Sequence, residues 1–520
     1  MTEGRLRFPS LIVFMSNTCV MTLELVAGRI VAPYIGVSLY TWTSVIGVIL
    51  AGLSIGNYFG GKLADRRASR RMLGLLFIAA GALSLSTILI LDVIASRGIP
   101  VAFINLPLIL RIVFIITAIF FLPSTLLGMI SPMVVKLALR DLERTGETIG
   151  RIYAASAFGS IVGTFATGFF LISWVGTRAI VVGVAVFLAA MGVVLGDWFR
   201  KKWIAPAAAV LLLGIPFLGP VRTVIANGPC LYETNYFCIK IFDQVGSDGA
   251  TYKAMALDRL VHSLVDPERP ERLEYGYERV YPEILQYLAA EKQDLSILVI
   301  GGGGYSLPRY VETVYPHMQV EVVEIDPGVS EAAYQHFGLS RETKIRTYNE
   351  DGRQFLVQLA AGKQYDLIVL DAVNDLSVPY HLTTREYNQL MQAHLAPGGI
   401  IVTNMIDGYR RQFVAAYLRT MGAVFPHVHL VATYADWETN LRTTYQVIAS
   451  AAPIDFSRLD SLDGGDGVTE IGQWRIPDAR VEQIISETRP YILLTDDYVP
   501  VDNLLAPVVA DSERIGTGQE

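Results

Sequence analysis

The chain has 520 residues, more than a single hydrophobic core of about 250–300 residues accommodates, so at least two domains are expected. Hydrophobic residues make up 52% of the sequence, which excludes a wholly soluble protein. The net charge of −7 gives no basic surface for a nucleic acid, so nucleic acid is not an expected partner.

The first part of the chain, residues 1–222, is predicted to be a transmembrane helical domain. Seven apolar stretches reach about twenty residues, the length of an α-helix that crosses a bilayer. The fourth stretch contains Pro123 and Pro132, which indicates either one kinked helix or a helix followed by a re-entrant piece. The lipid bilayer is therefore an expected partner. The stretches cover 10–31, 39–61, 72–95, 104–135, 148–172, 176–196 and 203–220.

Basic residues cluster in every second connection between these stretches, at 5–7, 62–71, 136–144 and 200–202. Because the cytoplasmic loops of membrane proteins are enriched in Lys and Arg, the N-terminus is expected in the cytoplasm. Seven spans then place everything after Pro220 outside. We expect a multi-pass protein of a bacterial-type inner membrane with an exterior globular domain.

Three ionisable residues, Glu24, Asp92 and Arg111, fall within or near the predicted spans. Such groups are costly in a bilayer, so they either line a substrate path or pair inside the helical domain. The loop GKLADRRASRR at 61–71 is similar to the cytoplasmic loop between the second and third helices of major-facilitator transporters. A plain anchor with a positive-inside loop accounts for the same residues, so both interpretations stay open.

Residues 223–295 are predicted to form a small β-strand subdomain and a linker. Alternating residues at 236–242, a glycine turn at 246–249 and a further run at 252–265 are typical of short strands. Cys230 and Cys238 lie in this region. In an exterior compartment they would form a disulfide if their geometry allows it, whereas in the cytoplasm they would remain free thiols.

Strand and helix patterns alternate over residues 296–505, which predicts a Rossmann-like α/β domain. The first five strands are expected to be parallel because helices separate them, and the last two to form an antiparallel edge. This is the seven-stranded layout of S-adenosylmethionine-type transferases. A flexible tail is expected at 506–520. The predicted strands are 296–301, 319–324, 344–348, 365–371, 399–405, 425–433 and 443–449, and the predicted helices are 305–315, 328–337, 352–361, 384–395 and 409–423.

Four motifs of this domain carry the candidate site. Gly301–Gly304 follow the first strand, where glycine allows a sharp turn and the close approach of a ligand. Glu324 ends the second strand, where such folds hold the ribose hydroxyls of a nucleoside. Asp351, after the third strand, either accepts from an adenine amino group or caps the next helix. Asp371 follows the fourth strand, at the sheet edge where open α/β folds do chemistry.

Other chemistries lack a matching pattern. A dinucleotide enzyme usually has a third glycine at the place of Ser306, which weakens a nicotinamide interpretation. The sequence contains no His/Cys cluster with zinc-ligand spacing and no Gly-x-Ser-x-Gly elbow. No metal is therefore expected.

Five segments in order resemble the spermidine synthase, or aminopropyltransferase, family: LDRLVHS (257–263), VIGGGG (299–304), VVEID (322–326), EDG (350–352) and DAVNDL (371–376). The most similar branch is membrane-fused and is often described as fused major-facilitator/spermidine synthase. The resemblance implies that an aminopropyl group moves from decarboxylated S-adenosylmethionine to a polyamine-like amine.

The resemblance also implies roles for single residues. Asp371, aided by Tyr277, would take the proton of the attacking amine and is the expected catalytic group. The donor-binding residues would be Gly301, Gly303, Glu324 and Asp351. The substrate-binding residues would be His262, Tyr275, Asn374 and Asp375.

The sequence departs from this family at Gly304, where the family has an Asp that binds the amino group of the aminopropyl chain. Two other functions therefore stay open. One is a transporter or sensor that binds a nucleoside or polyamine without turnover, and the other is an S-adenosylmethionine-dependent methyltransferase. A small-molecule amine is the expected partner, and a homo-oligomer is compatible with the sequence.

Overall fold

The chain consists of two compact units, Met1–Cys238 and Ile239–Glu520. The boundary between them falls within the predicted β subdomain. The computed structural model describes residues 6, 8–97, 106–139, 145–198, 204–205, 207–208, 228–246, 249–360, 362–372 and 378–514.

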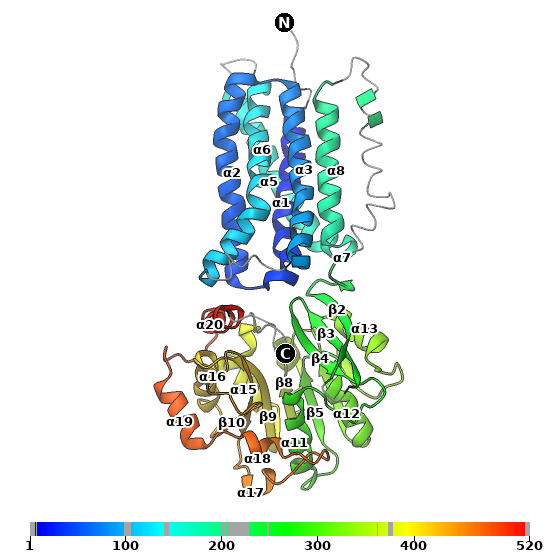
Figure 1. The fold of residues 1–520 in the computed structure, drawn as a ribbon, viewed down its shortest axis with the longest axis vertical. Coiled ribbons are helices and arrows are strands. Elements are labelled where there is room, and N and C mark those ends of the chain that lie inside the picture. The colour runs from blue at the N-terminus through cyan, green and yellow to red at the C-terminus, as the bar shows by residue number, and fades with distance from the viewer. Residues whose placement is uncertain are drawn as a thin grey trace. The chain divides into compact units, whose positions relative to one another are not determined.

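The first unit is a bundle of long apolar helices (Figure 1). Within the described residues, six helical segments are long and apolar enough to cross a membrane. The predicted fourth span is one helix that includes both prolines. The seventh predicted span, 203–220, lies almost entirely outside the described residues. The segments are α1 (Pro9–Ile35), α2 (Leu39–Arg67), α3 (Arg70–Arg97), α5 (Leu108–Ala138), the run of α6 (Thr145–Ala166), η1 (Thr167–Leu171) and α7 (Ile172–Val175), and α8 (Thr177–Leu195).

Small residues allow close packing in this bundle. A Cβ on Gly56 of α2 would lie 2.1 Å from the carbonyl oxygen of Thr125 in α5, so the contact excludes any side chain. Asp92 of α3 forms an ion pair with Arg178 of α8. For this acid, the structure therefore favours internal pairing over a place in a substrate path.

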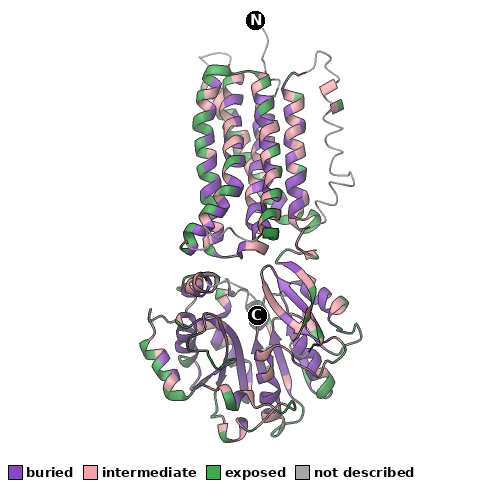
Figure 2. Cartoon of the chain, viewed as in Figure 1, coloured by how far each residue is buried: buried purple, intermediate pink, exposed green. Residues whose placement is uncertain are grey.

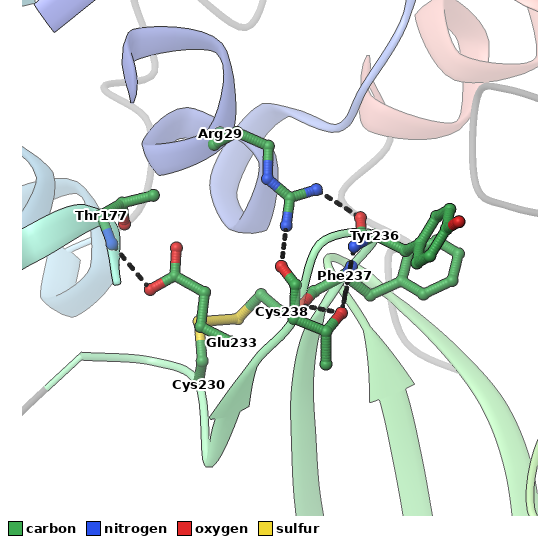
Figure 3. The surroundings of a disulfide bond; sticks show 8 residues. Arg29, Thr177, Cys230, Glu233, Tyr236, Phe237 and Cys238 are labelled. Atoms are coloured by element: carbon green, nitrogen blue, oxygen red, sulfur yellow. Dashed lines mark hydrogen bonds between the residues drawn. A yellow bond between two sulfur atoms is a disulfide. The ribbon is translucent and has the colours of Figure 1, made fainter. Parts of the chain in front are cut away.

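The segment after the bundle is tied to the end where α1 finishes and α8 begins (Figure 3). Arg29 donates to the Thr234 carbonyl oxygen at 2.6 Å, and the Thr177 N–H donates to the Glu233 carboxylate at 3.1 Å. Leu195 lies at the other end of α8, a helix of 19 residues. At a rise of about 1.5 Å per residue, the two ends are roughly 28 Å apart. Leu195 and Glu233 therefore lie at opposite ends of the bundle.

A four-stranded sheet, in the order β1-β2-β3-β4, occupies the region of the predicted β subdomain. The β2–β3 and β3–β4 pairs are antiparallel, and His262 is the extra residue of an irregularity in β4. Cys230 and Cys238 form a disulfide at the start of this sheet, with their Cα atoms 5.1 Å apart (Figure 3). The strands are β1 (Tyr232–Glu233), β2 (Cys238–Val245), β3 (Thr251–Leu257) and β4 (Leu260–Val265).

A seven-stranded sheet forms the centre of the second unit, in the order β10-β11-β9-β8-β5-β6-β7. Its first five strands in sequence pair in parallel, and β10 and β11 add an antiparallel edge, as predicted. The fold is the Rossmann-like transferase type that the sequence predicts. The strands are β5 (Ser296–Ile300), β6 (Gln319–Val323), β7 (Arg346–Tyr348), β8 (Tyr365–Leu370), β9 (Leu395–Asp407), β10 (His427–Ala432) and β11 (Thr443–Ser450).

Helices precede, connect and follow these strands and cover both faces of the sheet (Figure 1). They are η3 (Gly276–Arg279), α11 (Val280–Ala289), α12 (Ser306–Val314), α13 (Pro327–His336), α14 (Gly352–Gln358), η4 (Tyr380–Leu382), α15 (Arg385–Ala393), α16 (Gln412–Gly422), α17 (Phe456–Leu459), α18 (Glu470–Trp474), α19 (Asp478–Glu487) and α20 (Val501–Arg514).

Alternate residues of the central strands enter two hydrophobic cores, one on each face. In β5, Leu298 and Ile300 pack with α14, α15 and α16, whereas Ile297 and Val299 pack with α11 and α12. This period of two follows from the pleat of a strand. The central strands are buried along most of their length (Figure 2). The sheet is therefore a rigid support for the loops at the carboxyl ends of its strands.

The C-terminal segment differs from the prediction, because residues 506–514 belong to α20 rather than to a flexible tail. Apolar residues at helical spacing, Val501, Leu504, Leu505 and Val508, are buried in the core on the α16 face of the sheet. This burial explains why the helix extends past the predicted domain end.

Candidate active site

The glycine loop after β5 needs glycine for two separate reasons. Gly301 has φ +105°, and a Cβ there would lie 2.0 Å from the backbone oxygen of Asp371. Gly303 has φ +48°, and its Cβ would lie 2.7 Å from the Ser263 hydroxyl. Both the backbone conformation and the space therefore exclude a larger residue. The loop lies directly against the backbone that carries the candidate catalytic acid.

Glu324 braces this loop from the end of β6. One carboxylate oxygen accepts from the N–H of Gly302 at 2.7 Å, and the other accepts from the N–H of Asp326 at 2.9 Å. Burial raises the pKa of Glu324 to about 7, although these backbone N–H groups oppose the rise. The sequence places Glu324 beside the glycines, and the structure adds that its carboxylate orders their backbone.

Gly304, the point of departure from the family, is tightly packed. A Cβ on Gly304 would lie 3.0 Å from both the Cβ of Ser263 and a methyl carbon of Val265. The N–H of Gly304 also donates to the Ser263 hydroxyl at 2.7 Å. Strand β4 thus packs over this residue, and a Cβ there would require these side chains to shift by a few tenths of an ångström.

Asp371 and Tyr277 are brought together from distant parts of the chain. The Tyr277 hydroxyl donates to Oδ2 of Asp371 at 2.9 Å, and the Asn404 side-chain amide donates to Oδ1 at 2.7 Å. Asp371 as a whole is partly exposed, but its carboxyl group is desolvated. This desolvation raises the pKa of Asp371, and the two hydrogen bonds oppose the rise. Burial also keeps the pKa of Tyr277 well above its usual value, so Tyr277 remains the donor.

A buried polar chain extends from Asp371 into the sheet. Gln446 of β11 donates to the Asn404 side-chain oxygen at 2.9 Å, and the Tyr281 hydroxyl lies 3.5 Å from the Gln446 oxygen. Sequence reasoning missed these three residues. The available signal was an amide side chain within each of two strands that are otherwise apolar, because a buried amide needs a partner.

Asp351 acts as a helix cap, one of the two alternatives left open by the sequence. Its Oδ1 accepts from the N–H groups of Arg353 and Gln354, both at 3.0 Å, at the start of α14. Its Oδ2 lies 2.7 Å from Nε2 of His381, a residue that sequence reasoning missed. The hydrogen bond with His381 lowers the pKa of Asp351. An adenine amino group would have to share this carboxylate with His381.

Two of the remaining predicted residues, Tyr275 and His262, lie at or beside β4. The Tyr275 ring centroid is 5.1 Å from that of Tyr277, and the Tyr275 hydroxyl donates to the Val261 carbonyl oxygen at 3.3 Å. His262 lies on β4, next to the strand residue that contacts the glycine loop. Asn374 and Asp375 fall outside the described residues.

Metal-ligand types do not gather in this part of the chain. Across the residues that the structure describes, no group of three or more His, Cys, Asp or Glu residues has the arrangement of a metal site.

Comparison with known proteins gives one family match. Residues 278–456 match the family model described as "Spermine/spermidine synthase domain". This range begins next to Tyr277 and contains the glycine loop, Glu324 and Asp371.

Three curated relatives are similar to parts of the chain. The "Polyamine aminopropyltransferase" of Vibrio vulnificus is 29% identical over 190 residues, which cover 36% of this chain and 61% of the relative. The protein of the same name from Corynebacterium efficiens is 27% identical over 345 residues, which cover 60% of this chain and 63% of the relative. The human "eEF1A lysine and N-terminal methyltransferase" is 30% identical over 148 residues, which cover 26% of this chain and 21% of the relative.

The chain spans less than two thirds of the length of each of these relatives. Residues 278–456 are similar to spermine/spermidine synthase domains, and the candidate site lies within and directly before this range.

Proposed function

We propose that the protein is a membrane-anchored transferase that moves an aminopropyl group from decarboxylated S-adenosylmethionine to a polyamine-like amine. The observation that carries this proposal is the pairing of Asp371 with Tyr277 directly beside the glycine loop. The family match and the names of the two bacterial relatives support the same reaction.

The chemistry requires a neutral amine. Its nitrogen lone pair attacks the aminopropyl carbon bonded to the sulfonium, a new C–N bond forms, and the C–S bond electrons return to sulfur. Methylthioadenosine leaves as a neutral thioether. The amine proton passes to Asp371, whose desolvated carboxyl has a raised pKa and so accepts a proton more readily than an exposed Asp. Tyr277 and Asn404 hold the two carboxylate oxygens in fixed positions.

The nucleoside half of the donor would lie along the carboxyl ends of β5, β6 and β7. Gly301 and Gly303 leave the backbone accessible, and Glu324 would offer its carboxylate to the ribose hydroxyls. Asp351 would face the adenine amino group from its position at the start of α14. His381, which pairs with Asp351, would move or share that carboxylate on binding.

Three features support membrane anchoring with an exterior site. Six helices have the length and apolar character of spans. The segment at Glu233 contacts the bundle end that holds Arg29 and Thr177, opposite the end that the positive-inside rule assigns to the cytoplasm. The disulfide of Cys230 and Cys238 fits an oxidising compartment. In addition, the match with the C. efficiens relative covers 60% of this chain, which is more than the second unit contains, so it includes part of the first unit.

Similarity to the human methyltransferase favours methyl transfer as the second candidate. The two reactions differ in their nucleoside product, methylthioadenosine or S-adenosylhomocysteine. We would incubate the purified full-length protein with each sulfonium donor and a panel of diamines and polyamines, and identify products by mass spectrometry. Methylthioadenosine together with a lengthened amine supports aminopropyl transfer. S-adenosylhomocysteine would favour methyl transfer, and the absence of both would favour a binding protein.

A further inference from the structure

A second buried acid lies beside the catalytic pair. Glu278, in η3, directly follows Tyr277 and exposes only 5% of its surface. Its Oε2 atom makes no hydrogen bond with the described residues, and neither does the buried hydroxyl of Ser306. Buried carboxyls are normally paired or fully hydrogen-bonded, because an unpartnered one costs free energy. This acid is therefore available to a ligand.

The charges around Glu278 are negative. Burial raises its pKa to about 8, the neighbouring Asp371 and Glu274 raise it further, and the nearby Ser306 side chain and the Tyr275 backbone oppose the rise. Glu274 has its own cation, Arg272, at 2.8 Å. A cationic group of a ligand beside Glu278 would offset the negative charge of these acidic neighbours.

The location of Glu278 indicates which cation would fill this place. Ser306 is the first residue of α12, two positions after Gly304, so it lies at the donor loop rather than at the far side of Asp371. The loop itself supplies no acid at Gly304, where β4 packs closely over the backbone. A donor held by the loop would extend its chain from sulfur toward Asp371 and would pass this buried acid.

We propose that Glu278, with Ser306 beside it, binds the terminal ammonium of the donor's aminopropyl chain and thereby selects decarboxylated S-adenosylmethionine. This inference rests on the proposed function and adds a specificity-determining residue to it. S-adenosylmethionine carries an extra carboxylate on the carbon that bears the ammonium. Where Glu278 is ionised, that carboxylate meets like charge from Glu278 and Asp371 in a poorly solvated site, so the intact donor is disfavoured.

The test is a set of binding titrations with the purified full-length protein in detergent. The ligands are decarboxylated S-adenosylmethionine, S-adenosylmethionine and methylthioadenosine, which lacks the ammonium. We expect the wild type to bind the decarboxylated donor more tightly than the other two. Glu278→Gln should weaken binding of the decarboxylated donor by about tenfold to a hundredfold, the range for loss of a charged hydrogen bond. Its affinity for methylthioadenosine should stay within about threefold, and its discrimination against S-adenosylmethionine should fall.

Glu274→Gln is the matched control, because it removes a nearby carboxylate that already has a cation partner. It should change the preference between the two sulfonium donors by less than about threefold. An equal effect of both substitutions would overturn the proposal, because the overall negative charge near the site would then account for the donor preference without a specific role for Glu278. Unchanged donor affinity in Glu278→Gln would overturn it as well.

The wild type provides a measurement that does not depend on any variant. If it binds S-adenosylmethionine as tightly as the decarboxylated donor, the proposed selection does not exist. The result is also separable from turnover. A wild type that discriminates between the donors through Glu278 but forms no product would contradict the proposed function and leave this inference standing. Turnover without a role for Glu278 in binding would support the proposed function and contradict this inference.

Discussion

Asp371→Asn is the substitution that separates chemistry from binding. In the wild type, Oδ1 accepts from Asn404 and Oδ2 accepts from Tyr277. An Asn side chain keeps the first bond if its oxygen faces Asn404. Its amide group then faces the Tyr277 hydroxyl, which can rotate and accept because a hydroxyl is both donor and acceptor. The substitution therefore fits without leaving a buried polar atom unpaired, and the fold should persist.

The expected loss of turnover follows from the proton that an amide cannot take. A positioned general base contributes about 10²–10⁴-fold to a rate, which corresponds to roughly 3–5 kcal/mol of activation free energy. Tyr277→Phe removes one hydrogen bond to the carboxylate and leaves the base in place. Loss of one charged hydrogen bond of about 1.5–3 kcal/mol predicts a roughly tenfold to hundredfold smaller kcat.

The assay is methylthioadenosine release by the full-length protein at saturating donor and amine, with methylthioadenosine binding measured in parallel. Asp366→Asn is the matched control, since Asp366 belongs to the opposite end of β8 and pairs with Lys292 at 2.7 Å. It should retain turnover at temperatures where the protein is folded. If Asp371→Asn turns over within tenfold of the wild type, the role of general base is refuted.

Three further predictions concern the loop, the pH dependence and the membrane side. Gly301→Ala should lower the melting temperature by several degrees more than Gly398→Ala. Both glycines have positive φ, but only a Cβ at position 301 would overlap a backbone oxygen, an overpacking cost of about 1–3 kcal/mol. Equal decreases in melting temperature would contradict the close approach at Gly301. Affinity for the decarboxylated donor should rise as the pH rises through about 8, because only ionised Glu278 attracts an ammonium. If Glu278→Gln leaves the dependence of affinity on pH unchanged, this role of Glu278 is contradicted. The titratable groups around Glu278 are Asp371, Glu274, Tyr275, Tyr277 and Tyr281, and burial raises the pKa of Tyr275 to about 12 and those of Tyr277 and Tyr281 well above their usual value. In right-side-out vesicles, an impermeant maleimide should label the disulfide cysteines only after an impermeant reductant is added; labelling that requires permeabilisation would contradict the exterior site.

The regular elements of the second unit were predictable because burial leaves a clear pattern. Each central strand is a short apolar run that ends in a polar or glycine residue, as Ile300 precedes Gly301 and Leu370 precedes Asp371. The strand bounds agree with the structure to within a few residues. The end of the chain was harder, because the apolar spacing of 501–508 is short and has no flanking cap signal.

The site was predictable in part. The position of Asp371 follows from the strand that precedes it, whereas its partner Tyr277 came only from the family resemblance. Asn404 and Gln446 were missed because their contacts depend on the β9–β11 register, which the sequence does not encode locally. His381 was missed for the same reason, since its bond to Asp351 joins two separate loops.

Gly304 shows how a departure from a family pattern acquires a physical reason. From the sequence alone it removed an expected charge partner of the donor. The structure adds that Ser263 and Val265 of β4 pack closely over this position, and that Glu278, which directly follows Tyr277, is buried. The proposed role of Glu278 would restore an acid for the donor's ammonium.

Transfer of label from donor to acceptor tests the central claim most directly. Decarboxylated S-adenosylmethionine with ¹³C in its aminopropyl carbons would be incubated with the wild-type protein and a diamine. The account predicts that all three labelled carbons appear in a lengthened amine, in amounts equal to the methylthioadenosine released, and that Asp371→Asn forms neither. Methylthioadenosine without labelled amine, or no reaction with any amine, would contradict it.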